Sequence, residues 1–333
     1  MRVGVIGIGF GQHVHVPAFR RDTRVQVAAI CATSKARASA VAERLSIPQA
    51  FGDWRSLIND PSLDAVSISV PPQLQAEIAI AAARAGKHLF LEKPLATNGQ
   101  QALGILEAAA STGVVAAVDF EFRAAPAWLK AREIIASGRL GRLKRAFISW
   151  RIETFAYRTN QTTWKRGTGG GALNLFVSHS LDSIEWLFGH VDRLAARLEP
   201  GTVSDARAEL WLNLADGPDV SISVAADLPG GSGHRAEVYG EDGALFLENR
   251  SPDYIAGFTL TTALCSMPSA VVPLPGPASN GDGRIDAVAA IIGRFVDAVE
   301  TRGPMCPGLH EGMVVQKWLD LARESHRSGT WLS

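Results

Sequence analysis

The first third of the chain alternates short apolar runs with alanine-rich amphipathic stretches, and this alternation constrains the fold more than any other feature. It is typical of βαβ units, in which each strand of a parallel sheet is followed by a helix that packs on the sheet. The predicted strands are 2–8, 25–32, 65–70, 88–92 and 114–119, and the predicted helices are 17–21, 34–45, 73–85 and 99–110. The sequence therefore predicts an α/β fold that begins with a doubly wound parallel sheet in a domain of residues 1–120.

From residue 121 onward the pattern changes to longer alternating runs separated by turn residues. Hairpin-like breaks at 215–217 and 241–243 favour an antiparallel sheet. The predicted strands are 144–152, 193–198, 206–214, 219–226, 234–239 and 244–248, and the predicted helices are 128–136, 174–188 and 285–300. We expect residues 121–333 to form an α+β domain with a large, mostly antiparallel open sheet. Such a sheet exposes an apolar face, which predicts a homodimer or homotetramer packed through it.

Composition narrows the functions that are open to the chain. Its 33 basic and 33 acidic side chains balance, which argues against nucleic acid or an anionic membrane as a partner. Cys31, Cys265 and Cys306 form no CxxC or Cys/His spacing, and His13 and His15 have no third ligand near them in sequence, so no metal site is expected. No apolar run approaches the roughly 20 residues of a membrane span, and the first strand leaves no room for a signal peptide. We expect a cytoplasmic protein.

A glycine turn follows the first predicted strand. Gly7, Gly9, Phe10 and Gly11 resemble the GxGxxG fingerprint of a Rossmann dinucleotide-binding domain, although Gln12 stands where the last glycine is usual. Glycine at the first position allows the tight turn, and glycine at the second lets the backbone approach a pyrophosphate. The position of the turn in a βαβ unit favours cofactor binding over a plain structural turn.

The end of the second predicted strand bears on the choice of cofactor. An acidic residue there would bind the ribose 2′-hydroxyl of NAD and repel a 2′-phosphate. The chain instead places Thr33, Ser34, Lys35 and Arg37 in this region, two hydroxyls and two cations that suit a phosphate. This predicts a preference for NADP(H), with NAD(H) possible. The alternative is that a hydroxyl only caps the following helix and the two cations are solvated.

Further motifs follow at Val70-Pro71-Pro72 and Glu92-Lys93-Pro94, the latter directly after a buried strand. Together with the glycine turn they resemble the glucose-fructose oxidoreductase / inositol dehydrogenase / rhizopine-catabolism (Gfo/Idh/MocA) family. The resemblance extends over most of the chain through Phe122-Arg123, Trp164-Lys165, the run 169–173, Ser178-His179 and Asp182.

The resemblance implies an NAD(P)-dependent oxidoreductase that acts on CH-OH groups of a sugar, cyclitol or related polyol. It assigns Lys93 to the cofactor and the reacting oxygen, and His179 to proton exchange at that oxygen. A cation stabilises a developing alkoxide, and an imidazole can pass a proton near neutral pH. It also places Pro71 and Glu92 at the cofactor and points to a set of substrate-binding residues: Glu121, Arg123, Trp164, Asn174 and His179. The alternatives are a structural ion pair of Lys93 and a core position for His179.

The sequence departs from this family in three places. Many members carry an aspartate one helical turn before the histidine, but here Leu175 stands there, after Asn174. Gln75 occupies a position where relatives often have histidine, and Glu121 one where many have asparagine. Glu121 is a candidate for the missing carboxylate, or a solvated partner of a neighbouring arginine. The loss of the aspartate leaves open a non-catalytic NADP-binding regulatory or scaffold protein, and a lyase or hydrolase that returns its hydride is a further alternative.

Overall fold

The computed structural model describes residues 1–160, 165, 169–201, 204–265, 267–274 and 281–333. The chain divides into two compact units. The first unit consists of Met1–Glu121 and Arg284–Gln316, and the second consists of Phe122–Gly283 and Lys317–Ser333. None of the helices in the described part of the chain combines the length and apolar character needed to cross a bilayer.

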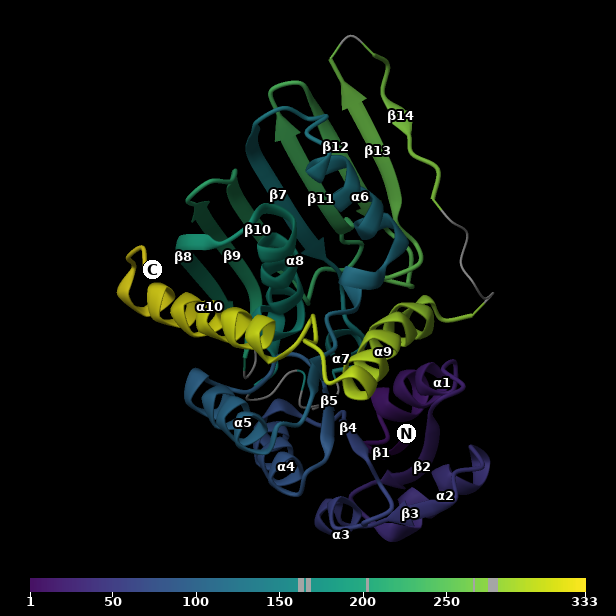
Figure 1. The fold of residues 1–333 in the computed structure, drawn as a ribbon. Helices are drawn as coiled ribbons and strands as arrows, with labels where there is room; N and C mark the ends of the chain where they lie inside the picture. The colour runs from purple at the N-terminus through teal and green to yellow at the C-terminus, as the bar shows by residue number, and fades with distance from the viewer. Residues whose placement is uncertain (161–164, 166–168, 202–203, 266, 275–280) are drawn as a thin grey trace. The chain divides into compact units, whose positions relative to one another are not determined.

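The first unit is built on a six-stranded parallel sheet (Figure 1). Its spatial order is β3-β2-β1-β4-β5-β6, the order of a doubly wound sheet whose direction of winding reverses between β1 and β4. This confirms the predicted fold class, and in such sheets nucleotides bind at the carboxyl ends of the strands near the reversal. The strands are β1 (Arg2–Ile6), β2 (Gln26–Cys31), β3 (Gln49–Phe51), β4 (Ala65–Ile68), β5 (His88–Leu91) and β6 (Ala116–Val118).

Helices cover both faces of this sheet. Phe90 of β5 contacts Phe19 and Phe295, with ring centroids 5.4 and 5.9 Å apart, so α1 and α9 lie on one face. Helices α4 and α5 pack against each other beyond the other face (Figure 1). The contact of Phe295 explains why 284–316 belong to the first unit, although the sequence analysis assigned them to the second region. The helices are α1 (Val16–Phe19), α2 (Lys35–Arg44), α3 (Trp54–Ile58), α4 (Pro72–Arg84), α5 (Gly99–Thr112) and α9 (Gly283–Thr301).

The second unit is built on an eight-stranded sheet of order β14-β13-β12-β11-β7-β10-β9-β8. Neighbouring strands are antiparallel except β7 and β10, which are parallel. The prediction of a large, mostly antiparallel sheet is therefore confirmed. The strands are β7 (Leu143–Arg151), β8 (Val191–Pro200), β9 (Asp205–Leu214), β10 (Asp219–Ala225), β11 (Gly233–Gly240), β12 (Gly243–Asn249), β13 (Thr259–Leu264) and β14 (Ala270–Val271).

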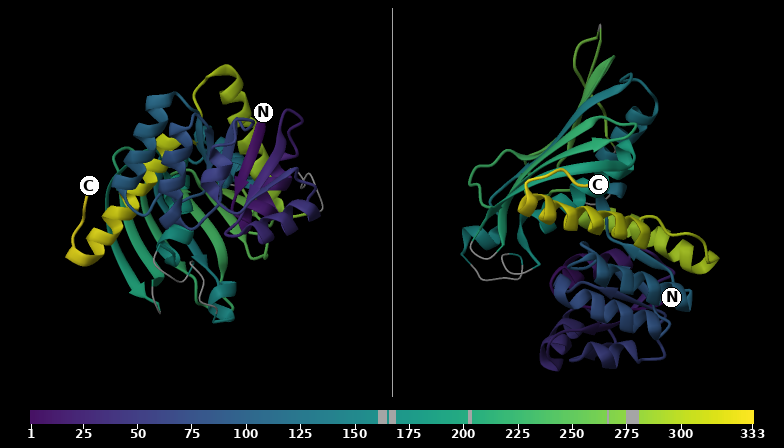
Figure 2. Two further views of the ribbon diagram at one scale, coloured as in Figure 1. Left: turned by 90° about the horizontal axis from the view of Figure 1, so that it is seen from below. Right: turned by 90° about the vertical axis from the view of Figure 1, so that its left-hand side faces the viewer.

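One face of this larger sheet is covered within the unit. The helices α6 (Pro126–Ala136) and α8 (Ser178–Phe188) and the later part of α10 (Leu309–Ser328) lie on it (Figures 1 and 2). Side chains alternate along the strands as the pleat requires, so Ile148 is buried whereas its neighbour Phe147 is 41% exposed. The buried set on this face forms the core of the unit.

The opposite face of the sheet is mainly polar. Arg145 pairs with Asp219 at 3.3 Å, and the Ser223 hydroxyl accepts a hydrogen bond from Arg151 and donates one to Glu209. Exposed aromatic side chains, among them Phe147 and Trp211, are scattered between these pairs. The continuous apolar face that the sequence suggested is thus replaced by ion pairs with isolated aromatic rings.

Several elements were not predicted from the sequence. The strand β3 has three residues and α3 has five, so neither is long enough to show a hydrophobic period. Strands β13 and β14 and the 20-residue α10 were also missed. The predicted helix 174–188 begins as a π-helical turn, Leu173–Val177, before α8.

Candidate functional site

The glycine turn after β1 fits the diphosphate of a dinucleotide. Gly7 has φ +110°, and a Cβ there would overlap the carbonyl oxygen of Ser69, so only glycine fits. At Gly9 no atom lies within 4 Å of the place of a Cβ, which leaves the backbone open to a ligand. The π-helical turn Gly11–His15 follows, and Phe10 provides no side-chain cap for its N–H groups. Uncapped N–H groups of this kind bind phosphate.

The residues predicted to select the cofactor lie together at the start of α2. The side chains of Thr33, Ser34, Lys35 and Arg37 are all exposed. Ser34 caps α2 by accepting from the Arg37 N–H, and the Arg37 guanidinium donates to Thr33 Oγ1 at 3.0 Å. Lys35 donates to the carbonyl oxygen of Ala50. The capping alternative therefore holds for Ser34, while the exposed hydroxyls and cations still share one surface.

Gln75 holds the backbone segment that carries Lys93 by hydrogen bonds. This glutamine lies on α4, three positions after Pro72, and it is 1% exposed. Its Nε2 donates to the carbonyl oxygens of Glu92, Pro94 and Leu95 at 2.6, 3.1 and 3.1 Å. Gln75, which entered the sequence analysis only as a departure, is thus the side chain that fixes the backbone on both sides of Lys93.

His15 connects the glycine turn with this segment. The side chain is fully buried, and its Nε2 lies 3.0 Å from Glu92 Oε1 and 3.3 Å from Asp119 Oδ2. Its Nδ1 lies 2.7 Å from the hydroxyl of Ser67 on β4. Burial by itself lowers the pKa of His15, but the contacts with Asp119 and Glu92 outweigh burial and raise this pKa to about 9. His15 is therefore an imidazolium at neutral pH.

Two buried carboxyl groups follow β6: Asp119, which contacts His15, and Glu121. Burial raises the pKa of Asp119 to about 6, although His15 acts in the opposite direction. Burial and the charge of Asp119 raise the pKa of Glu121 to about 8, against the opposing charge of Lys93. Asp119 is therefore ionised at pH 7 and Glu121 holds a proton. Groups whose pKa values are pushed apart in this way are typical of acid–base sites.

The ligand atoms of His15, Glu92 and Asp119 lie within 4.8 Å of one another, a spacing that could hold a metal ion. Coordination requires a neutral imidazole, and the raised pKa of His15 means that a metal would have to displace a bound proton. The contacts of 3.0 and 3.3 Å are those of an ion pair. The geometry thus supports a charged hydrogen-bonded cluster.

In the second unit His179 occupies the second position of α8 and is 3% exposed. Its ring is packed edge-on against Phe122, with centroids 5.0 Å apart, and tilted against Trp150 at 5.9 Å. Leu175 lies in the π-helical turn that precedes α8. Trp164, which the sequence analysis placed at the substrate, lies outside the described residues.

Two other predicted substrate residues are engaged in contacts within the second unit. Arg123 forms a buried two-pronged ion pair with Asp182, with nitrogen to oxygen distances of 2.8 to 3.1 Å. The Asn174 amide donates to the carbonyl oxygen of Gly169 at 2.8 Å and accepts from Arg323 at 2.6 Å. These contacts orient α8 and the turn before it, so a substrate hydroxyl would have to compete with them.

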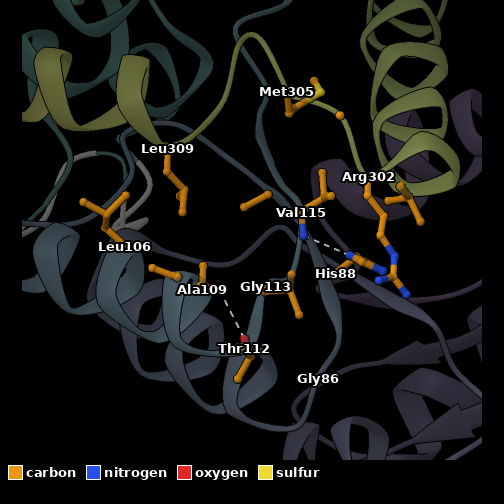
Figure 3. Close-up of a pocket in the computed structure, with 15 residues that line it drawn as sticks. Gly86, His88, Leu106, Ala109, Thr112, Gly113, Val115, Arg302, Met305 and Leu309 are labelled. Carbon is orange, nitrogen blue, oxygen red and sulfur yellow. Dashed lines mark hydrogen bonds between the residues drawn. The ribbon is translucent and has the colours of Figure 1, made fainter.

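A hollow of about 720 Å³ lies at the opposite, amino-terminal edge of the parallel sheet (Figure 3). It is lined by α5, the first residues of β5 and β6, and the segment after α9, including Arg302 and Met305. His88 accepts a hydrogen bond from the Val115 N–H at this edge. Of the described residues predicted to bind cofactor or substrate, none lines it.

Sequence reasoning did not identify His15, Asp119 and Gln75 as one connected group. In the sequence, His15 stands out only for its spacing from His13. The sequence indicated this group only weakly, through a histidine inside the turn after the glycines and an aspartate at the end of a buried strand. Their proximity depends on the neighbouring positions of β4, β5 and β6 in the sheet.

A parallel sheet with an open glycine turn and a second unit built on a large mixed sheet define a dinucleotide-binding oxidoreductase of two units. Residues 1–120 match the model for an oxidoreductase family with an NAD-binding Rossmann fold, and residues 128–246 match the Gfo/Idh/MocA C-terminal domain. The chain belongs to the Gfo/Idh/MocA oxidoreductase family.

Individual relatives agree with this assignment. An uncharacterised oxidoreductase of Synechocystis is 32% identical over 100% of this chain and 96% of its own length. The inositol 2-dehydrogenase of Acidothermus cellulolyticus is 30% identical over 76% of this chain and 74% of its own. Among solved structures, a levoglucosan dehydrogenase in complex with NADH and L-sorbose has a TM-score of 0.90 at 25% identity, covering 100% of this chain and 98% of that one.

Proposed function

We propose that this protein transfers a hydride between NADP(H) and the carbonyl or hydroxyl carbon of a sugar, cyclitol or related polyol. The observation that carries the proposal is the common position of the open glycine turn and Lys93 at the carboxyl ends of β1 and β5. Relatives named for inositol and levoglucosan support the substrate class.

The cofactor preference rests on the surface at the start of α2. Thr33, Ser34, Lys35 and Arg37 offer hydroxyls and positive charge and no carboxylate, which suits a 2′-phosphate. Asp53 lies near this surface, where its charge contributes to the raised pKa of Cys31, but its carboxylate accepts the Ser56 N–H and caps α3. NAD(H) remains the second cofactor to test, since related structures contain NADH.

In the proposed reaction the nicotinamide supplies or accepts the hydride. Gly7, Gly9, Phe10 and Gly11 bind the diphosphate, with Pro71 and Glu92 near the cofactor. Lys93 stabilises negative charge on the reacting oxygen, and His179 exchanges its proton. Glu121 and Arg123, with Trp164 and Asn174, are proposed to contact the substrate. The absence of an aspartate at Leu175 leaves the acid–base work to the remaining titratable groups.

The test is deuteride transfer. The protein is incubated with NADPH or NADH deuterated at C4, in both stereochemical forms, together with a panel of keto-sugars and cyclitol ketones, and products are analysed by mass spectrometry. We expect labelled alcohol, with faster turnover from NADPH. Lys93→Met should abolish labelling while nucleotide affinity is retained, and Lys130→Met, the same change on the exposed surface of α6, should have no effect.

The competing function is a nucleotide-binding regulatory or scaffold protein. Tight NADPH binding without labelling of any member of the panel would favour it and would contradict the proposed reaction. Labelling that Lys93→Met leaves unchanged would contradict the role of Lys93.

We also propose a cytoplasmic homodimer or homotetramer that packs through the second sheet. The three cysteines are free, which suits a reducing compartment. The exposed face of the second sheet carries aromatic rings such as Phe147 and Trp211, and aromatic side chains are enriched in interfaces between subunits. Sedimentation showing only monomer at micromolar concentration would contradict the oligomer.

A further inference from the structure

Without the charge of His15, the described carboxylates near Lys93 outnumber the cations. Glu92 precedes Lys93 directly, and Asp119 and Glu121 follow β6, the strand beside β5. With Glu121 protonated, two carboxylates remain at neutral pH, and Asp119 is 1% exposed. Buried carboxylates without a counterion are strongly unfavourable, so they attract the nearest cation.

His15 supplies this cation. Its Nε2 contacts Glu92 at 3.0 Å and Asp119 at 3.3 Å, and its Nδ1 is held by Ser67 at 2.7 Å. Neither oxygen of Asp119 accepts a well-aligned hydrogen bond from any described residue, so the His15 charge is the main compensation for this carboxylate. The imidazolium therefore reduces the pull of both carboxylates on the Lys93 ammonium.

Packing fixes the His15 ring rigidly in this place. Phe10 of the glycine turn and Phe90 of β5 each meet the ring edge-on, with centroids 5.2 Å apart in both cases. The guanidinium of Arg284 on α9 lies over the Phe10 ring, 5.5 Å from its centroid. His15 thus touches both the turn proposed to bind diphosphate and the strand that leads to Lys93.

We propose that His15 is a positioning residue for the reaction: its imidazolium fixes the carboxylates of Glu92 and Asp119 and thereby limits how strongly they draw on the Lys93 ammonium. This inference rests on the proposed function. Without the imidazolium, both carboxylates would draw more strongly on Lys93, which already interacts electrostatically with Asp119. The effect is on the chemical step, so kcat changes more than the KM for the substrate.

The first test examines the charge of His15 directly. In protein with ¹⁵N-labelled histidine, the ring signals are followed by NMR from pH 5 to 10, and the His15 signal is assigned by its loss in His15→Gln. We expect it to remain that of an imidazolium through neutral pH and to titrate at about 9. Titration near 6.5, the ordinary value, would overturn the proposal. This measurement requires neither substrate nor cofactor.

The second test uses the deuteride assay with His15→Gln and the double variant His15→Gln/Asp119→Asn. We expect the single variant to lose at least about tenfold in kcat with little change in KM, and the double variant to recover part of this loss because one uncompensated charge is removed. Because His15 favours the ionised form of Asp119, the pKa of Asp119 should rise in His15→Gln, and kcat of this variant should recover in part as pH falls and Asp119 takes up a proton.

His190→Gln is the matched control, because His190 also pairs with a carboxylate, Glu185 at 2.9 Å, but its side chain is 87% exposed. It should leave kcat and its pH profile unchanged. A His15→Gln profile that superimposes on that of the unsubstituted protein would overturn the proposal. If the unsubstituted protein labels no substrate, the proposed function fails, while the NMR titration still decides the charge of His15.

Discussion

His15 in the first unit and His234 in the second are both buried, 0% and 3% exposed, and the two rings have opposite surroundings. In the first unit His15 lies between Glu92 and Asp119, and its pKa is raised to about 9. In the second unit His234 is stacked on Trp150, with centroids 4.3 Å and planes 4° apart, and edge-on to Phe258. Neither ring nitrogen of His234 has a hydrogen-bond partner among the described residues, and burial lowers its pKa to about 3.

Burial alone therefore does not decide the charge of a histidine. Desolvation disfavours the imidazolium at both sites, but two neighbouring carboxylates reverse the result at His15. His15 is therefore a cation at neutral pH in a charged cluster, whereas His234 is a neutral member of an aromatic core. The two units should accordingly respond in opposite ways to substitution and to pH.

The largest expected effect comes from replacing each histidine by phenylalanine. His15→Phe leaves Glu92 and Asp119 without their cation and should destabilise the first unit by about 3–5 kcal/mol. His234→Phe keeps an aromatic ring and removes two unsatisfied nitrogens, so the second unit should keep or gain stability. Hydrogen exchange of β1 and β5 against β7 and β11 measures the units separately. An equal loss of stability in both variants would contradict the different roles of the two histidines.

Acid should destabilise the second unit through His234. Its pKa is lower in the folded protein than in the unfolded chain, where it is near 6.5, so the unfolded state takes up the proton first. Stability is lost as pH falls from 6.5 toward 3, by up to about 1.4 kcal/mol per pH unit. Urea unfolding at pH 7, 6 and 5, followed by tryptophan fluorescence, should show a shallower decline in His234→Phe. Parallel curves would contradict this role.

Alkali should act on the first unit through Glu121. Its pKa is raised from 4.5 to about 8 on folding, so the folded state holds a proton that the unfolded chain has released. Stability is therefore present below pH 4.5 and is lost as pH rises toward 8, by at most about 1.4 kcal/mol per unit, in part offset by Lys93. Glu121→Gln should flatten this slope in thermal unfolding between pH 5 and 8. An unchanged slope would show that Glu121 ionises normally.

The smallest expected effect concerns helix ends. Asn98 caps α5 by accepting the Gln101 N–H at 3.0 Å, whereas Thr154 precedes α7 (Phe155–Arg158) in the second unit without such a bond. Asn98→Ala should cost about 1 kcal/mol in the free energy of unfolding, and Thr154→Ala should cost much less. Urea unfolding of both variants provides the comparison. A larger loss from Thr154→Ala would mean that its side chain stabilises this region in another way.

Much of the fold was predictable because it depends on local patterns. Alternating apolar runs indicated both sheets, and the glycines at 7 and 9 marked a turn in which Gly7 leaves no room for a side chain. The strand β3 and α3 were too short to show a period, and α10 was missed. The exposed face of the second sheet was expected to be apolar, since sequence alternation does not show which polar side chains pair across strands.

Three features of the site could be read from the sequence: the glycine turn, the position of Lys93 after a buried strand, and the lack of a carboxylate at 31–37. Tertiary packing brings His15 to Glu92, 77 residues away, and Gln75 to the backbone around Lys93. It also decided the charges, because a pKa depends on burial and on neighbours that the chain brings together only when the sheet forms. His15 and His234 are the same residue type in sequence, and their opposite charge states follow from the carboxylates around one and the aromatic rings around the other.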